Sequence, residues 1–185
     1  MNKNIHTAWT AAAALLASTA AASAEVAHDH AEADAATAWH VNAPLVRKVR
    51  LATEQYRDIN VALADGYAPA TPCVSGPNSG AMGVHLINSA LLGKEIDAEM
   101  PEALIYEPYP DGRMRLVGVE FITFAADWVD TVPVLDGHLL HYVGAPNRYG
   151  IPAFYEIHVW AWRNNPDGAF ADWNPRVSCA GQPLS

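Results

Sequence analysis

Residues 155–162 constrain the fold most, because their side chains alternate strictly between two kinds. A β-strand turns successive side chains to opposite faces of its sheet, so this alternation predicts a half-buried strand. One face is apolar, and the other carries Glu156, His158, Trp160 and Trp162. A face that combines a carboxylate, an imidazole and two indoles points either to solvent or into a pocket. We expect the chain to fold around this strand, with His158 facing a pocket.

A predicted hairpin lies upstream of this strand. Its strands cover residues 103–109 and 113–124, and Pro110-Asp111-Gly112 has the residue types of a tight turn. Within the second strand, Glu120 interrupts the apolar run LVGVEFITF. An unpaired, ionised carboxylate there would be costly, so Glu120 needs a metal ion, a cationic side chain or a proton as its partner. We expect Gly118 to leave room above the strand, as the floor of a pocket would require.

An apolar stripe predicts one long helix over residues 43–64. The apolar positions recur at alternating spacings of four and three residues, which places them on one helix face: Leu45, Val49, Ala52, Tyr56, Ile59 and Leu63. Together with the strands downstream, this helix predicts an α+β fold. In that fold, a long N-terminal amphipathic helix packs on a curled antiparallel sheet or a half-barrel.

The first 24 residues have the features of a secretory signal peptide. Lys3 supplies the positive start, residues 11–22 are small and apolar, and Ala22-Ser23-Ala24 is a suitable cleavage site. Residues 25–41 are rich in Ala, acids and His, which is typical of a flexible arm. We expect residues 42–185 to form a single globular domain of a periplasmic or secreted protein.

The net charge limits the partners that the protein can have. The chain has 11 Lys and Arg against 20 Asp and Glu, a net charge of −9, and removal of residues 1–24 with Lys3 leaves −10. Such an acidic surface argues against nucleic acid and anionic membranes, and it is compatible with cations. Beyond the signal peptide, the sequence predicts no membrane span, because no second apolar segment is long enough.

The chain has two cysteines, Cys73 and Cys179. In an exported protein, an isolated pair predicts a disulfide. The competing interpretation is a pair of thiolate metal ligands, which is less favoured because neither cysteine belongs to a C-x-x-C motif.

Four side chains in separate predicted elements suggest a metal site: His85, Glu120, His141 and His158. Neutral imidazoles with a carboxylate suit zinc, copper, iron, nickel or manganese. His138 could take the place of His141, since the two lie three residues apart near a predicted turn. The competing interpretation is that these histidines are ordinary hydrogen-bonded residues and that Glu120 pairs with an arginine.

Two other functions stay open. One is a metal-free module that binds a small molecule in a pocket lined by Tyr106, Trp160 and Trp162, where Glu120 and His158 orient a polar ligand group. The other is a metal-dependent enzyme, which an open coordination position beside a pocket would favour. No nucleophile motif is present, so the sequence assigns no catalytic residue.

Several motifs between about residues 50 and 179 carry a resemblance: MGVH (82–85), YEP (106–108), LVGVEF (116–121), HVWAW (158–162) and NPDGAFADWNPRVSC (165–179). In these motifs the chain resembles a family of small exported bacterial proteins of uncharacterised function. The resemblance implies export and a single domain. It transfers no catalytic residue to this sequence.

Overall fold

The computed structural model describes residues 43–182, so the predicted signal peptide (1–24) and arm (25–41) lie outside the described residues. The described part is mostly β-sheet, and α2 (Pro44–Ala52) is the only helix of seven residues or more within it. None of the helices in this part is long and apolar enough to cross a membrane.

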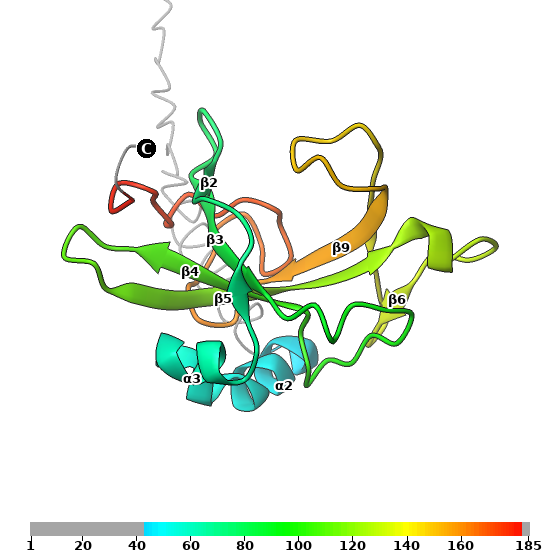
Figure 1. The fold of residues 1–185 in the computed structure, drawn as a ribbon, viewed down its shortest axis with the longest axis horizontal. Helices are drawn as coiled ribbons and strands as arrows, with labels where there is room; N and C mark the ends of the chain where they lie inside the picture. Colours follow the sequence, from blue (N-terminus) through cyan, green and yellow to red (C-terminus); the bar gives the residue numbers. More distant parts are fainter. Residues whose placement is uncertain (1–42, 183–185) are drawn as a thin grey trace, which may run out of the picture.

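One antiparallel sheet forms the centre of the molecule (Figure 1). Its strands lie in the order β1 (Ala68–Pro69), β3 (Ala81–Ile87), β4 (Ala103–Pro108), β5 (Met114–Phe124), β9 (Phe154–Val159) and β8 (His141–Val143). β2 (Val74–Ser75) also pairs with β3, and β6 (Val134–Leu135) pairs separately with β7 (His138–Leu139). A 3₁₀ turn, η2 (Ala125–Asp127), follows β5.

The predicted hairpin is confirmed. β4 and β5 pair antiparallel and begin and end within one residue of the predicted bounds. In the turn, the Gly112 N–H donates to the Tyr109 carbonyl at 2.9 Å, and Gly112 has a φ of 83°. Glycine adopts this left-handed conformation without a steric penalty, which explains why it stands at the turn.

The prediction of an α+β fold with one long helix over residues 43–64 is wrong. The segment divides into α2, the 3₁₀ helix η1 (Glu54–Arg57) and α3 (Ile59–Ala64). At the first break, the Thr53 hydroxyl donates to the Val49 carbonyl at 2.7 Å, a bond that competes with the regular helix. At the second break, Asp58 has an extended backbone, and its side chain caps α3 by accepting from the Asn60 N–H.

These breaks change which side chains face the core. The predicted stripe assumes an uninterrupted rotation per residue, and the extended backbone at Asp58 shifts that rotation. Ala62 is therefore fully buried, whereas Leu63, a member of the predicted stripe, is exposed. The helical pieces are short, so the sheet supplies most of the regular structure.

The helical pieces cover one face of the sheet, as Figure 1 shows below the strands. The main core lies between them and brings together Leu45, Val46, Val49, Leu86, Leu104, Tyr106, Val119, Phe121, Ile157 and Val159. Two smaller apolar clusters lie elsewhere: Ala81, Ile105, Val117, Trp160 and Val177 form one, and Ala103, Ile122 and Phe154 form the other. Their strand residues alternate with those of the main core, which places them on the opposite face.

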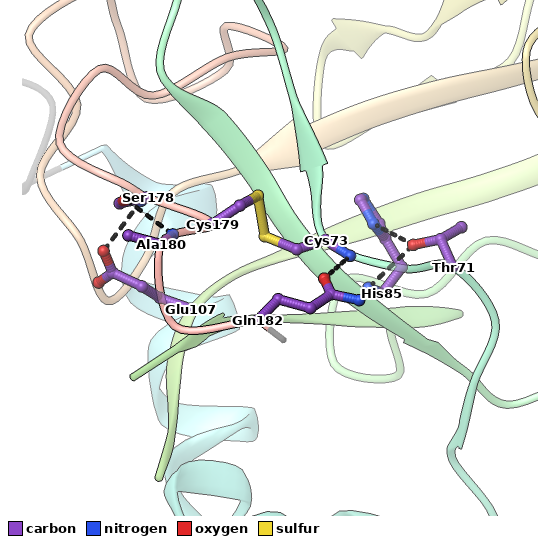
Figure 2. The surroundings of a disulfide bond; sticks show 8 residues. All are labelled: Thr71, Cys73, His85, Glu107, Ser178, Cys179, Ala180 and Gln182. Atoms are coloured by element: carbon purple, nitrogen blue, oxygen red, sulfur yellow. Dashed lines mark hydrogen bonds between the residues drawn. A yellow bond between two sulfur atoms is a disulfide. The ribbon is translucent and has the colours of Figure 1, made fainter. Parts of the chain in front are cut away.

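The predicted disulfide between Cys73 and Cys179 is present, with 5.6 Å between the two Cα atoms. It joins the segment before β2 to the C-terminal segment (Figure 2). Two hydrogen bonds support this junction: the Cys73 N–H donates to Gln182 Oε1, and the Ser178 N–H donates to Glu107 Oε1 at 3.0 Å. Disulfides persist in oxidising compartments, so the bond points to a non-reducing environment for this protein.

Removal of the disulfide is expected to lower stability. A Cys73→Ser, Cys179→Ser variant should lose about 2–5 kcal/mol of unfolding free energy, because the long loop between the cysteines regains its freedom in the unfolded chain. Urea denaturation followed by Trp fluorescence measures the change. Wild-type protein in reductant is the control and should behave like the variant. An unchanged midpoint would show that the C-terminal segment is held by its other contacts alone.

Candidate metal site

Three buried side chains meet on the sheet face opposite to the helices. His85 comes from β3, Glu120 from β5 and His158 from β9, and none is more than 4% exposed. Each offers a nitrogen or oxygen, and these three atoms lie within 4.8 Å of one another. Glu120 stands directly opposite His158 in the pairing of β5 with β9. Glu120 and His158 therefore lie side by side on the same face of the sheet.

His85 reaches this point from one strand further away. β4 separates β3 from β5, and it presents Ala103 opposite Glu120. Because alanine has a short side chain, the space above it is available to the longer His85. The His85 Nε2 atom consequently lies 3.3 Å from Glu120 Oε2.

Thr71 lies beside one ring nitrogen of His85, and the other ring nitrogen faces Glu120. Its Oγ1 lies 3.2 Å from His85 Nδ1 and accepts from the His85 backbone N–H at 3.3 Å (Figure 2). Burial lowers the pKa of His85 to about 4, so the ring is neutral at pH 7. When Nδ1 carries the proton and donates it to Thr71, the Nε2 lone pair is free and faces Glu120.

Glu120 is a buried carboxyl beside a second carboxyl. Burial raises its pKa well above the usual range, and a hydrogen bond with Glu156, together with the charge of that residue, adds to the increase. Burial also raises the pKa of Glu156, which lies on β9. Both shifts favour the protonated form of the carboxyl, whereas a divalent cation bound at Glu120 would favour its ionised form.

His158 is the most unusual member of the group. Its ring is 1% exposed, and among the described residues neither Nδ1 nor Nε2 has a hydrogen-bond partner. Burial lowers the pKa of His158 well below the usual range, with a further contribution from His85, so the ring is neutral. A buried polar atom without a partner costs about 1–3 kcal/mol. A metal ligand requires a neutral imidazole with one free nitrogen lone pair, and His158 offers one.

Packing fixes the orientation of the His158 ring. The ring stacks on Trp160 with an interplanar angle of 16° and meets His85 edge-on, with centroids 5.9 Å apart. The Trp160 N–H in turn donates to the Ala171 carbonyl at 2.6 Å. The imidazole is therefore positioned by rings on two sides without using either of its nitrogens.

A second group of potential ligands shares His158. It consists of Glu156, His158 and Asp172, again with one ligand atom each within 4.8 Å of the others. Glu156 belongs to the same alternating row as His158, so the sequence pattern could have indicated it. Asp172 and Thr71 lie in irregular segments, where no periodicity signals which side chains approach the sheet.

The predicted ligand His141 lies outside the group of His85, Glu120 and His158. It is exposed on β8, opposite Glu156, and its Nδ1 is 3.4 Å from Asp172 Oδ1. His138, three residues earlier, packs on Phe170 with ring centroids 4.3 Å apart. Three of the four predicted metal residues therefore come together, and His141 stands beside the second group.

The cluster is accessible from a pocket of about 480 Å³. His85 and Glu120 belong to its lining, together with residues 70–75, which include Cys73. Ile122, Phe154, Arg148 and Tyr149 complete much of the remaining wall. The disulfide thus anchors the segment that forms one wall of the pocket and that carries Thr71 to His85.

The predicted ligand-pocket residues do not share one pocket. Trp160 and Trp162 both line a small pocket of about 160 Å³, and Tyr106 is not part of its lining. The buried Tyr106 instead donates its hydroxyl proton to the Tyr56 carbonyl at 2.6 Å. Trp162 donates its N–H to Thr53 Oγ1 at 3.0 Å, on the helix side of the sheet. The strand ends at Val159, so the alternation that placed Trp162 beside His158 does not apply there.

Gly118 does not form a pocket floor as expected. A Cβ atom at this position would lie 2.9 Å from the Val159 carbonyl oxygen and 3.2 Å from Trp160 Cε3. The indole therefore fills the space that the missing side chain leaves. Gly118 still serves the site, because it permits the position of Trp160 on which His158 stacks.

Comparisons with protein-family models, curated proteins and solved structures found no match. The resemblance to a family of small exported proteins stays a prediction. The case for a function therefore rests on the geometry of the buried cluster.

Glu102, close to this cluster, is expected to make stability depend on pH. It is 1% exposed, its Oε2 accepts from the Ile122 N–H at 3.1 Å, and burial raises its pKa to about 7. The folded state thus holds a proton that the unfolded state releases above about pH 4.5. This contribution to stability is complete below that pH and is lost as the pH rises through 7.

A Glu102→Gln variant tests this expectation, because the amide keeps an acceptor for Ile122 and cannot ionise. The unfolding free energy of the variant minus that of the wild type should increase by on the order of 1–3 kcal/mol when the pH is raised from 5 to 8. Urea denaturation at both pH values measures the gain. A difference between the two proteins that does not change with pH would contradict the shifted titration.

Proposed function

We propose that this protein binds a transition-metal ion through His85, Glu120 and His158 and that it acts in the periplasm or another oxidising compartment. The observation that carries the proposal is the His158 ring, which is buried with no hydrogen-bond partner for either nitrogen among the described residues. The imidazole of His85 and the carboxyl of Glu120 each place a potential ligand atom within 4.8 Å of one on His158. A single metal ion could bind one nitrogen of each imidazole and the carboxylate of Glu120 at once.

The distances support a small divalent ion. Bonds of about 2.1 Å in a tetrahedral site place neighbouring ligand atoms roughly 3.4 Å apart. His85 Nε2 and Glu120 Oε2 are 3.3 Å apart, so this pair already has the required separation. Two nitrogens and one carboxylate oxygen favour zinc, copper, iron, nickel or manganese, whereas calcium and magnesium prefer oxygen ligands alone.

A second candidate function is metal-dependent catalysis on a small molecule. Three protein ligands leave a coordination position open, and catalytic metal sites keep such a position. The pocket of about 480 Å³ that reaches His85 and Glu120 supports access to it. The metal-free binding module has less support, because Tyr106 is separated from the two Trp residues of its proposed pocket.

Export is part of the proposal. The disulfide supports a non-reducing compartment, and the signal-peptide features of residues 1–24 support secretion across the inner membrane. The acidic net charge of the chain is compatible with a cation as the partner.

Metal affinity of single variants tests the proposed ligands. The wild type should bind one equivalent of at least one of the five ions, measured by calorimetry and by elemental analysis after gel filtration. His158→Leu and Glu120→Gln should each weaken binding by at least about tenfold, since each removes a ligand. His141→Ala is the matched control and should bind as the wild type does.

Two outcomes would contradict the proposal. The first is a wild-type protein that binds none of the five ions, and the second is a His158→Leu variant that binds as tightly as the wild type. Asp172→Asn separates the two ligand groups that share His158. If Asp172→Asn weakens binding and Glu120→Gln does not, the metal belongs to the group of Glu156 and Asp172 instead.

Stability of the metal-free protein gives an independent test of the role of His158. A metal ligand contributes nothing to folding when no metal is present, and leucine fills a similar volume without unpaired nitrogens. His158→Leu should therefore keep the unfolding free energy of the metal-free protein within about 1 kcal/mol or raise it. The neighbouring buried residue supplies the control: Ile157→Ala should lose about 2–5 kcal/mol. If urea denaturation shows that His158→Leu loses as much unfolding free energy as Ile157→Ala, His158 has a structural role.

A further inference from the structure

A groove of about 900 Å³ lies on the helix side of the sheet, away from the metal site. Four arginines belong to its lining: Arg50 from α2, Arg57 from η1, and Arg113 and Arg115 from the β4–β5 hairpin. The remaining lining includes Trp162, Tyr109 and Asp58. The groove shares no lining residue with the pocket beside His85 and Glu120.

The charge of this groove is opposite to that of the chain as a whole. The chain has a net charge of −9, yet the groove lining contains four arginines and a single acid, Asp58. Asp58 uses Oδ1 to accept from the backbone and side-chain N–H groups of Asn60. Arg113 pairs with Asp111 at 2.6 Å, and within residues 43–182 the other three arginines form no ion pair. An excess of positive charge is thus concentrated in one groove.

Aromatic rings hold these arginines without neutralising them. The guanidinium carbons of Arg50 and Arg57 lie 4.9 and 5.5 Å from the centroid of the Trp162 ring. Trp162 is itself fixed by its hydrogen bond to Thr53. Cation–π contact restricts a guanidinium but leaves its N–H groups available to an anion.

A second ring supports the other pair of arginines. Arg113 lies over the Tyr109 ring at 5.4 Å, and Arg115 donates to the Tyr109 hydroxyl at 3.4 Å. Side chains that are already restricted lose less entropy when they bind a ligand. The groove therefore has two supported guanidinium pairs, one on the helical segment and one on the hairpin.

We propose that this groove binds a small molecule with at least two anionic groups, either phosphate or carboxylate. Guanidinium groups recognise the oxygens of both in bidentate pairs. Arginines from two separate parts of the chain are suited to a ligand whose charges lie at separate positions. The volume is within the range of small-molecule sites, which is roughly 300–1,000 Å³. The inference is independent of the proposed metal function.

Calorimetry with two probes tests this inference on the protein purified without its signal peptide. Pyrophosphate represents phosphate ligands, and tricarballylate represents carboxylate ligands. At least one should bind at low ionic strength and weaken as NaCl rises, because salt screens exposed charges. Two double variants test the arginines: one carries Arg50→Gln with Arg57→Gln, and the other carries Arg113→Gln with Arg115→Gln. Each should weaken the binding of that probe by at least about tenfold.

Arg176→Gln is the matched control, because Arg176 is exposed and lies outside the groove lining. It should bind the probe as the wild type does, and thermal melting should show that all variants fold. The inference is overturned if neither probe binds at millimolar concentration, or if the double variants bind as tightly as the wild type. Metal content is measured on the same samples. A probe that only chelates a metal would give equal heats in wild type and variants, which also overturns the inference.

Discussion

The pairing of β5 with β9 is the interaction on which the rest of the structure depends. It places Glu120 opposite His158 on one face and sends their neighbours Val119, Phe121 and Val159 into the main core on the other. A slip of one residue would exchange the two faces of a strand. It would then bring polar groups against the helices and apolar groups to the site. Burial of the core therefore enforces the position of the polar cluster.

The site is held by parts of the chain that lie far apart in the sequence. Thr71 reaches His85 from the segment that the disulfide anchors, and Trp160 supports His158 while it packs over Gly118. Stability and site geometry thus rest partly on the same contacts. The buried imidazoles and carboxyls cost free energy in the folded state unless they acquire partners, and a structure that keeps them buried is better suited to ligand binding than to stability alone.

The two faces of the sheet have opposite electrostatic character. The face with His85, Glu120 and His158 offers neutral nitrogens and carboxyls whose pKa values are raised, which suits a cation. On the helix side, the lining of the groove contains four arginines, which suits an anion. The two sets of lining residues do not overlap.

The sequence by itself determined the local features: the β4–β5 hairpin, the alternation of β9, the burial of Glu120 and the pairing of the cysteines. Each follows from a short-range period, a turn residue or simple cysteine counting. Only the tertiary structure decided that the long helix breaks at Thr53 and Asp58, that Trp162 turns to the helix side, and that His85 joins the cluster while His141 does not. The order of strands and the side-chain bonds that end elements are set by contacts between distant residues, which a local period does not contain.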